Sequence, residues 1–259
     1  METLKNVYES GEAPEGERER LKKLEYPTWV SEECIGEDIK GKTILDVGSG
    51  PNVALNKFAK DHGASYVAFD IEERFLRDQQ KESAMAVKGS ALALPFKEQA
   101  AEIVHMRFVL RFFSPEQRAK AIQEAVRAAK ERTLLVEYDW DTFRGGERVN
   151  KFVAFSLRLM AKAGVEAFMG KKLKEEVENL LPEKKNMIRE QRFSREAGTY
   201  YEELFALVPL TKKVIERVND PALAKEFDGI VLELEEESHK ENPEQFTRPD
   251  IVVVEVPTK

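Results

Sequence analysis

Short apolar runs alternate with amphipathic segments through residues 42–140. Runs rich in β-branched residues predict buried strands, and apolar residues that recur every three or four positions predict helices. The predicted strands are Thr43–Val47, Tyr66–Phe69, Met85–Lys88, Glu102–Met106 and Thr133–Tyr138, and the predicted helices are Pro51–Lys60, Glu72–Lys81 and a helix that begins at Ser114-Pro115. Strands separated by helices in this order predict an α/β fold with a doubly wound, mostly parallel sheet.

The pattern changes after Tyr138. Residues 141–228 have mainly helical periodicity, with one apolar face formed by Phe152, Phe155, Leu159 and Ala163 and another by Leu173, Val177, Leu180 and Leu181. A further helix is predicted over Thr199–Leu207, and strands over Ile230–Leu234 and Ile251–Val256. We therefore divide the chain into an N-terminal helical segment (1–40), an α/β core (41–142), a helical insertion (143–228) and a C-terminal strand pair (229–259).

Composition and charge narrow the class of protein. The 259 residues are 42% hydrophobic and carry a net charge of −7, a globular composition without the basic excess of most nucleic-acid binders. Basic and acidic residues mix between Lys171 and Arg195, which predicts a solvated helix face. Cys34 is the single cysteine, the first residues lack a signal-peptide pattern and no apolar run has bilayer length. We therefore expect a cytoplasmic protein without a membrane span or metal site, whose oligomeric state the sequence leaves open.

The first predicted strand runs into the turn Leu45-Asp46-Val47-Gly48-Ser49-Gly50. Gly48 and Gly50 carry no Cβ, so the backbone can approach a ligand closely there. Asp46 suits a cationic or hydroxyl-rich ligand better than a pyrophosphate. The second strand ends in Asp70, which could accept hydrogen bonds from two ribose hydroxyls, since ligands of doubly wound sheets lie beyond the carboxyl ends of the strands. A dinucleotide-dependent oxidoreductase is the main alternative, but its Gly-x-Gly-x-x-Gly/Ala fingerprint needs a small residue where Val53 stands.

This part of the chain resembles the class I S-adenosylmethionine-dependent methyltransferases, of the kind called methyltransferase type 11. The likeness covers residues 42–140 and includes the glycine turn, the acid Asp70 and the segment Leu92-Ala93-Leu94-Pro95-Phe96. It implies a Rossmann-like core at 41–142 that binds S-adenosylmethionine, within a seven-stranded sheet whose last strand is antiparallel. Two positions depart from the family: Asn52 stands where a small residue is common, and Ser90 where an acid commonly holds the adenine amino group.

The resemblance assigns cofactor contacts to strand ends and to the turns that follow them. These positions are Asp46, Gly48, Ser49, Gly50, Asn52, Asp70, Ile71, Ser90, Ala91, Arg107 and Phe108. In the family an N-terminal segment often closes over the cofactor, which makes Tyr26 and Trp29 secondary candidates. Packing against the core is the simpler interpretation of both aromatic residues.

The implied reaction is in-line transfer of the cofactor's methyl group to a small-molecule acceptor. The insertion could cover the acceptor, or its apolar residues could simply pack it onto the sheet; they are Phe152, Phe155, Leu159, Met160, Phe168 and Met169. A general base is needed only if the acceptor loses a proton. The sequence leaves the catalytic residue unknown, with Tyr138, Asp139 and Asp141 as candidates and Arg111 as a residue that could fix an acidic group. His105, inside the fourth strand, is expected to be a buried core residue.

Two other functions remain open. An RNA or protein methyltransferase would use the Lys171–Arg195 segment as a contact surface, and its binding to nucleic acid would depend strongly on salt. A cofactor-binding regulatory protein without catalysis would explain the lack of an obvious base. The negative net charge makes nucleic acid the less favoured partner.

Overall fold

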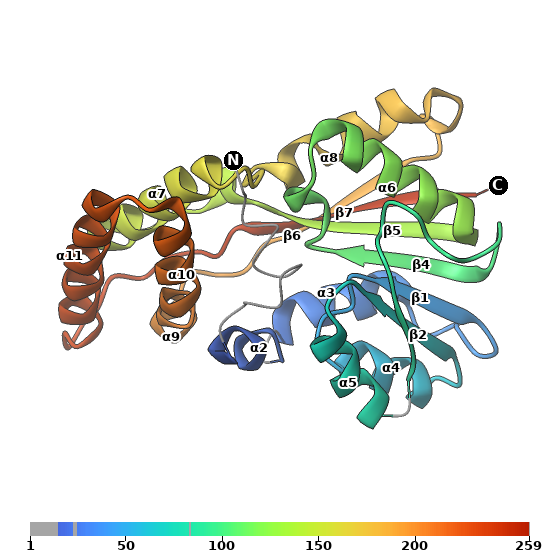
Figure 1. Ribbon diagram of the computed structural model, residues 1–259, viewed down its shortest axis with the longest axis horizontal. Helices are drawn as coiled ribbons and strands as arrows, with labels where there is room; N and C mark the ends of the chain where they lie inside the picture. The colour runs from blue at the N-terminus through green and yellow to red at the C-terminus, as the bar shows by residue number, and fades with distance from the viewer. Residues whose placement is uncertain (1–14, 23–24, 83, 259) are drawn as a thin grey trace.

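The computed structural model describes residues 15–22, 25–82 and 84–258. Its centre is a seven-stranded sheet in the order β3-β2-β1-β4-β5-β7-β6 (Figure 1). The strands are β1 (Thr43–Val47), β2 (Ser65–Asp70), β3 (Met85–Lys88), β4 (Ala101–Arg107), β5 (Ala129–Asp139), β6 (Arg189–Phe193) and β7 (Asp250–Pro257). β7 runs antiparallel to β5 and β6, and the other neighbouring pairs are parallel. This confirms the doubly wound, mostly parallel sheet with an antiparallel last strand.

Helices cover both faces of the sheet. They are α2 (Glu15–Lys22), α3 (Glu25–Ile35), α4 (Ala54–Asp61), α5 (Glu73–Lys81), η1 (Leu110–Phe112), α6 (Pro115–Ala128), η2 (Trp140–Thr142), α7 (Glu147–Lys162), α8 (Met169–Leu180), η3 (Pro182–Lys184), α9 (Tyr201–Phe205), α10 (Val208–Val218) and α11 (Pro221–Ser238). α6 and α8 lie over one face, and α3, α4 and α5 over the other (Figure 1). α6 begins where predicted, because Ser114 and Gln117 form a reciprocal capping box.

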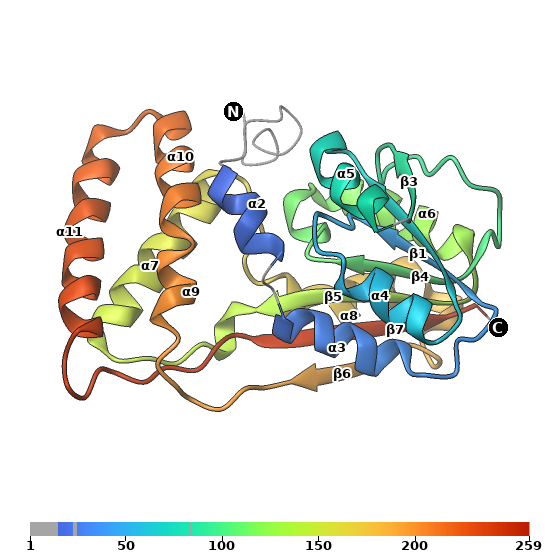
Figure 2. The ribbon, with the colours of Figure 1, turned by 90° about the horizontal axis from the view of Figure 1, so that it is seen from below.

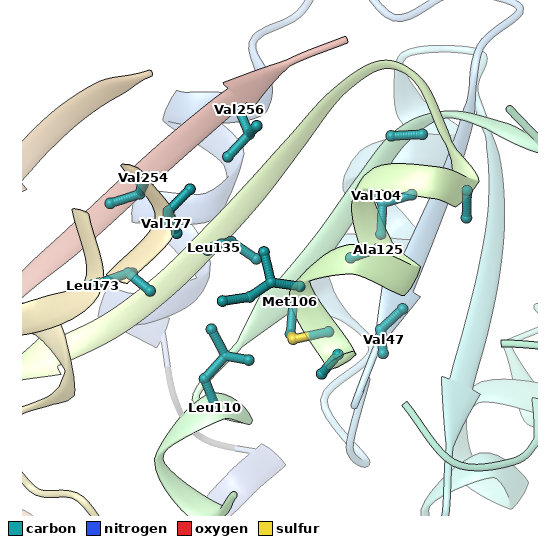
Figure 3. Packing of buried hydrophobic residues seen from close by; sticks show 14 of the residues in the cluster. Val47, Val104, Met106, Leu110, Ala125, Leu135, Leu173, Val177, Val254 and Val256 are labelled. Carbon is teal, nitrogen blue, oxygen red and sulfur yellow. The ribbon is translucent and has the colours of Figure 1, made fainter. Parts of the chain in front are cut away.

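Alternate residues of each strand supply two separate apolar cores. In β4, Val104 and Met106 belong to the core beneath α6 and α8, which Figure 3 shows from close by. Ile103, in the same strand, belongs to the core beneath α3 and α4. Because the sheet is buried on both faces, polar side chains that meet a ligand are expected at the strand ends.

Four helices, α7, α9, α10 and α11, form a unit that we call the helical block, with an apolar core of its own. Phe152 and Phe155 of α7 pack against Phe227 of α11, with ring centroids 5.9 and 5.0 Å apart. The block lies beyond the end of β5, and α2 lies between it and the sheet, in contact with α10 (Figure 2). Of the apolar residues predicted for the insertion, Phe152, Phe155 and Leu159 belong to the core of the block, whereas Met169 belongs to the core beneath α6 and α8.

Two secondary-structure predictions are wrong. Ile230–Leu234 is not a strand but part of α11, which Asp220 caps by accepting a hydrogen bond from Ala222 N (3.1 Å). A strand pair is therefore not formed within the described residues beyond 229, where β7 is the strand. The sheet edge beside β7 is β6, which lies in the segment predicted as a solvated helix face.

Neither a membrane-spanning helix nor a metal-binding cluster is found among the described residues. None of their helices combines the length and the apolar character that crossing a bilayer requires. They also contain no group of histidine, cysteine, aspartate and glutamate side chains arranged to hold a metal ion.

Candidate functional site

The turn after β1 is tied to the neighbouring strand and open on its outer side. Gly48 N and Ser49 N both donate to Phe69 O of β2, at 2.7 and 3.1 Å. Gly48 has φ +74°, and a Cβ there would lie 2.3 Å from Val109 Cγ2. Gly50 has φ +60°, and no described heavy atom lies within 4 Å of the position its Cβ would take. The first glycine therefore allows close packing, and the second leaves room for a ligand beside the backbone.

Asp70, at the end of β2, is fixed beside this turn. Its Oδ2 accepts a hydrogen bond from Gly50 N (2.9 Å) and its Oδ1 accepts one from Glu72 N (2.8 Å). Burial raises the pKa of Asp70 to about 6, although both backbone hydrogen bonds act in the opposite direction. Ile71 follows with 39% of its surface exposed. An acid and an apolar side chain thus lie next to the glycine turn.

Asp46 is not placed as the sequence analysis expects of a ligand-binding carboxylate. Its side chain is buried and accepts a hydrogen bond from Tyr66 Oη (2.5 Å). It also forms a hydrogen bond with His105 Nδ1 (2.7 Å). His105 is buried, and its Nε2 contacts Ser31 Oγ of α3 (2.9 Å). Burial tends to raise the pKa of Asp46, but His105 and Arg107 outweigh it and hold this pKa below its usual value. Asp46 therefore joins β1, β4 and α3 rather than offering a free carboxylate.

Asn52 and Gln79 hold the outer part of the turn. Asn52 Oδ1 accepts a hydrogen bond from Ala54 N (2.9 Å), so α4 begins at Ala54 and not at the predicted Pro51. Asn52 Nδ2 donates to the carbonyl oxygens of Leu21 and Lys22 in α2, at 3.3 and 3.2 Å. Gln79 of α5, which the sequence analysis does not select, donates through Nε2 to Asn52 O (2.8 Å). Helix α2 is thereby anchored to the turn.

Two serines near the site differ in their contacts. Ser90, after β3, accepts a hydrogen bond from Leu92 N through its Oγ (3.3 Å), and Ser90 and Ala91 are both partly buried. Ser49 Oγ is buried and has no hydrogen-bond partner among the described residues. A buried hydroxyl without a partner is costly, so a ligand atom that bonded to Ser49 Oγ would be bound favourably.

The two N-terminal candidates for a cofactor contact belong to helix α3. Trp29 is half exposed, and its ring meets Phe193 of β6 edge to face at 6.0 Å. β6 is the edge of the sheet farthest from β2 and β3, so Trp29 packs against the fold, the simpler of the two interpretations. Tyr26 lies in α3, but its side chain is outside the described residues.

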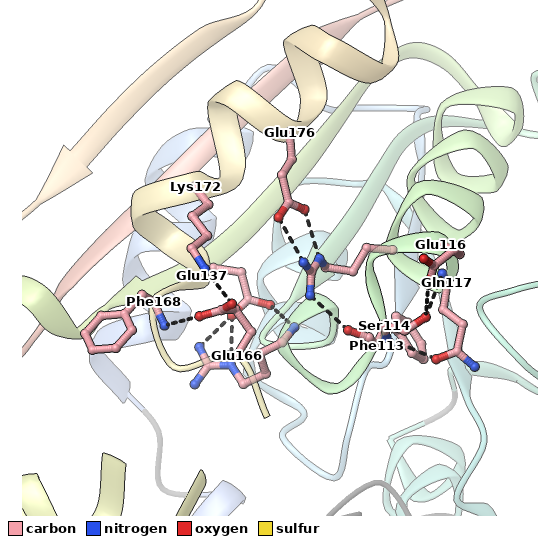
Figure 4. A network of polar contacts seen from close by, with 11 residues as sticks. Phe113, Ser114, Glu116, Gln117, Glu137, Glu166, Phe168, Lys172 and Glu176 are labelled. Atoms are coloured by element: carbon pink, nitrogen blue, oxygen red, sulfur yellow. Dashed lines mark hydrogen bonds and ion pairs between the residues drawn. The ribbon is translucent and has the colours of Figure 1, made fainter. Parts of the chain in front are cut away.

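Aromatic rings follow the ends of β4 and β5. Phe108, which has φ +59°, stacks on Tyr138 with ring centroids 4.2 Å apart. The guanidinium carbon of Arg111 lies 4.9 Å from the Phe108 ring centroid and 5.2 Å from that of Tyr138. Arg111 donates to Glu137 Oε2 at 2.6 and 2.8 Å, and Figure 4 shows Glu137 within this polar network. The buried ion pair occupies Arg111, which is therefore not free to fix an acidic group of a substrate.

The two aspartates considered as bases have structural partners. Asp139 is buried and accepts a hydrogen bond from Arg192 Nη1 of β6 (2.8 Å). Asp141 is exposed and pairs with Lys171 of α8 (2.6 Å). Both carboxylates are therefore held in ion pairs with cations of this chain. Burial raises the pKa of Tyr138, so its phenol stays protonated near neutral pH and can donate a hydrogen bond.

Residues 45–136, which run from β1 into β5, match the protein family described as “Methyltransferase domain”. The matched segment contains the glycine turn, Asp70 and Arg107. Residues 45–136 are therefore a methyltransferase domain of this family. The N-terminal helices and the helical block lie outside the matched segment. No curated protein matches the sequence of this chain.

Solved structures share the fold of this chain at low sequence identity. An S-adenosylmethionine-dependent methyltransferase of Thermotoga maritima is 13% identical with a TM-score of 0.51, over 99% of this chain and 100% of that one. Phosphoethanolamine N-methyltransferase 2 of Haemonchus contortus, solved with phosphomonomethylethanolamine and S-adenosylhomocysteine, is 13% identical with a TM-score of 0.53, over 90% and 52%. The [4+2]-cyclase SpnF is 15% identical with a TM-score of 0.51, over 86% and 77%. The fold therefore hosts more than one kind of reaction.

Proposed function

We propose that the protein transfers the methyl group of S-adenosylmethionine to a small-molecule acceptor held between the strand ends and the helical block. The observation that carries this proposal is the position of the block. It has an apolar core of its own, lies beyond the end of β5 and contacts α2, which bridges it to the sheet (Figure 2). An acceptor between block and sheet would be shielded from water on more than one side, which suits transfer to a small molecule.

The residues around the glycine turn fit S-adenosylmethionine. Gly50 leaves room beside its backbone, and Ser49 Oγ has no described partner. Asp70 would accept hydrogen bonds from the ribose hydroxyls, and Ile71 and Ala91 would offer apolar surface to the adenine. When bound, the cofactor supplies a methyl group activated by a sulfonium, and the protein supplies binding, orientation and electrostatics.

The chain's own contribution to the reaction is orientation and exclusion of water. Holding an acceptor in line with the transferred methyl could supply roughly 7–11 kcal/mol of the barrier. Tyr138 would donate a hydrogen bond to the acceptor, because its phenol stays protonated. Since Asp139 and Asp141 are held in ion pairs, we expect an acceptor whose reacting atom needs no strong base.

Ion pairs on α8 and β6 favour a small molecule over RNA as the acceptor. Lys171, Lys172 and Arg192 belong to the segment considered as an RNA contact surface. Each has a nitrogen within 2.8 Å of a carboxylate oxygen of this chain. Paired cations release fewer counterions from a nucleic acid, so this surface is poorly suited to bind one.

Two measurements test the proposed function. Calorimetry with S-adenosylhomocysteine should show binding to the wild-type protein and weaker binding to Asp70→Asn. Labelled methyl groups from S-adenosylmethionine should then enter a deproteinised small-molecule extract. Folded protein that does not bind S-adenosylhomocysteine would contradict the cofactor site, and label confined to protein or RNA would contradict the small-molecule acceptor.

A further inference from the structure

Four arginines act on Tyr138 at the end of β5. Burial raises the pKa of the Tyr138 phenol, and the positive charges of these arginines act in the opposite direction. They come from four different segments: Arg111 of η1, Arg20 of α2, Arg107 of β4 and Arg248 of the segment before β7. Four positive charges from different parts of the chain therefore gather around the end of β5.

Three of these four arginines have a carboxylate partner of their own. Arg111 pairs with Glu137 (2.6 Å) and Arg20 with Glu17 (2.7 Å). Arg248 pairs with Glu203 of α9. These three guanidinium groups are therefore already held in ion pairs within the chain.

Arg107 is the fourth, and it forms no close ion pair within the described residues, although its charge acts to lower the pKa of Asp46 and of Glu32. Its Nη1 donates to Thr28 Oγ1 of α3 (3.0 Å), and within the described residues it makes no further hydrogen bond and no ion pair. The side chain is partly buried, so N–H groups of its guanidinium that have no acceptor have lost hydration without gaining a hydrogen bond. Its remaining N–H groups form a planar fork that fits a carboxylate or a phosphate. Arg107 thus has N–H groups to which an anionic group of a ligand could bind.

The surroundings of Arg107 place this anion on the acceptor side of the site. Met106, which precedes Arg107, pairs with Val47, so Arg107 lies next to the glycine turn. On its other side β5 carries Tyr138, whose ring meets the ring of Trp140 at 6.0 Å. Trp140 Nε1 is buried without a hydrogen-bond partner in the part of the chain that the structure describes. A cation, two aromatic rings and an unpartnered N–H donor therefore follow one another from the turn toward the helical block.

We propose that the methyl acceptor is a small anion. Its carboxylate or phosphate group pairs with Arg107, its apolar part packs against Tyr138 and Trp140, and one of its oxygens accepts the hydrogen bond of Trp140 Nε1. This inference rests on the proposed function, because it names the substrate class of the same site.

The test separates the substrate class from the methyltransferase activity itself. A deproteinised small-molecule extract is divided on an anion exchanger at neutral pH, and each fraction is assayed for methyl incorporation. We expect activity in the retained, acidic fraction. Activity in the unretained fraction would overturn the anionic acceptor while leaving the proposed function intact. Label found only in macromolecules would overturn both.

Variants then assign the anion to Arg107. Arg107→Gln should raise the acceptor KM about ten- to hundredfold, the usual value of a hydrogen bond to a charged group, and Arg107→Lys should have a smaller effect. The Kd of S-adenosylhomocysteine should not change in either variant. Trp140→Phe keeps a ring but removes the N–H, and should also raise KM. Arg77→Gln on α5, an exposed arginine paired with Glu73 at 3.4 Å, is the control and should behave as wild type.

A second ligand excludes the main competing role for Arg107. The cofactor has a carboxylate of its own on its methionine part, and 5′-methylthioadenosine lacks that part. If Arg107→Gln weakens S-adenosylhomocysteine but not 5′-methylthioadenosine, then Arg107 binds the cofactor's carboxylate and the anionic acceptor is overturned. Unchanged Kd values for both ligands, together with a raised acceptor KM, support it. An unchanged acceptor KM in folded Arg107→Gln and Trp140→Phe also overturns it.

Discussion

Asp46 and Asp70 are both buried beside the glycine turn, yet their pKa values shift in opposite directions. Asp46 faces His105 and Tyr66, which stabilise its ionised form. Asp70 accepts from two backbone N–H groups, which do not outweigh the cost of burial. Asp70 is therefore the carboxylate whose protonation a ligand can change, whereas Asp46 stays ionised inside the fold.

The pKa of Asp70 predicts how cofactor binding depends on pH. Because the pKa is about 6 in the free protein, the carboxyl is mostly neutral below that pH. Ribose hydroxyls that donate to it favour the ionised form, so affinity should rise as pH increases and level off above 7. S-adenosylhomocysteine should bind about tenfold more weakly at pH 5 than at pH 7, as measured by calorimetry. Asp70→Asn should remove this dependence; equal wild-type Kd values at both pH values would contradict the prediction.

The two glycines of the turn should respond differently to alanine. Gly48→Ala combines a left-handed φ with a Cβ 2.3 Å from Val109 Cγ2, and should lower the free energy of unfolding by about 3 kcal/mol. Gly50→Ala has the strained φ but open space, and should cost about 1 kcal/mol. Its Cβ instead occupies the ligand's approach, so Gly50→Ala should lose affinity for S-adenosylhomocysteine. Denaturant titration and calorimetry separate the two effects, and equal losses of stability would refute the distinction.

At the scale of elements, the sequence predicts correctly the helices and strands whose pattern of apolar residues fits only one type of secondary structure. β1 and β3 have the predicted bounds, and α6 begins at the predicted cap. β6, with the sequence Arg-Glu-Gln-Arg-Phe, has no apolar alternation and becomes a strand through pairing with β7. Ile230–Leu234 is apolar and β-branched enough for a strand, but its helical spacing packs it into the block instead. Tertiary contacts determine the secondary structure of both segments, and these contacts cannot be read from the sequence alone.

In the candidate site, too, some features can be predicted from the sequence and others depend on tertiary contacts. The glycine turn and Asp70 follow from residue type and position at strand ends. The bond between Asp46 and His105 requires the β1–β4 register, which sets these two residues opposite each other. Ser31, which completes the network, comes from α3, a helix whose docking the sequence does not specify. Side chains alternate between the two faces of a strand. Assigning Asp46 and His105 to the same face of neighbouring strands is the signal that could have suggested this pair.

Two helix glycines should give opposite results with the same substitution. Gly229 of α11 has open space around its Cβ position, so Gly229→Ala should raise the free energy of unfolding by about 0.5–1 kcal/mol through helix propensity. In Gly170 of α8 a Cβ would lie 2.7 Å from the backbone carbonyl of Tyr138. Gly170→Ala should therefore lower the free energy of unfolding by about 2 kcal/mol or more. Denaturant titration of both variants measures the difference, and a loss of stability in Gly229→Ala would contradict the open space.

At the scale of the molecule, α2 links parts that are far apart in the sequence. Arg18 of α2 forms a bidentate ion pair with Asp78 of α5, at 2.5 and 2.8 Å. The carbonyls of the same helix accept from Asn52, and the helix contacts α10 of the helical block. The glycine turn, the sheet helices and the block are thus connected through eight residues, Glu15–Lys22.

Loosening this link should affect ligand binding more than global stability. Asp78→Asn replaces an anion by a neutral amide, and should speed amide hydrogen exchange in residues 15–22 about tenfold. The Kd of S-adenosylhomocysteine should rise, because Asn52 loses a fixed partner, while the melting temperature changes little. Asp228→Asn, which breaks an exposed pair with Lys212 (2.9 Å) in the block, is the control and should change neither. Unaltered exchange in Asp78→Asn would show that other contacts hold α2.

The strand order has a consequence for how the protein is made. β7 lies between β5 and β6, although β6 precedes it in the chain by more than fifty residues. During synthesis, β6 cannot pair with the sheet until residues 250–257 have left the ribosome and paired with β5. During that interval β5 presents bare amides and carbonyls along one side, which another unfinished chain could pair with. The nascent protein is then most vulnerable to aggregation, just before its synthesis reaches β7.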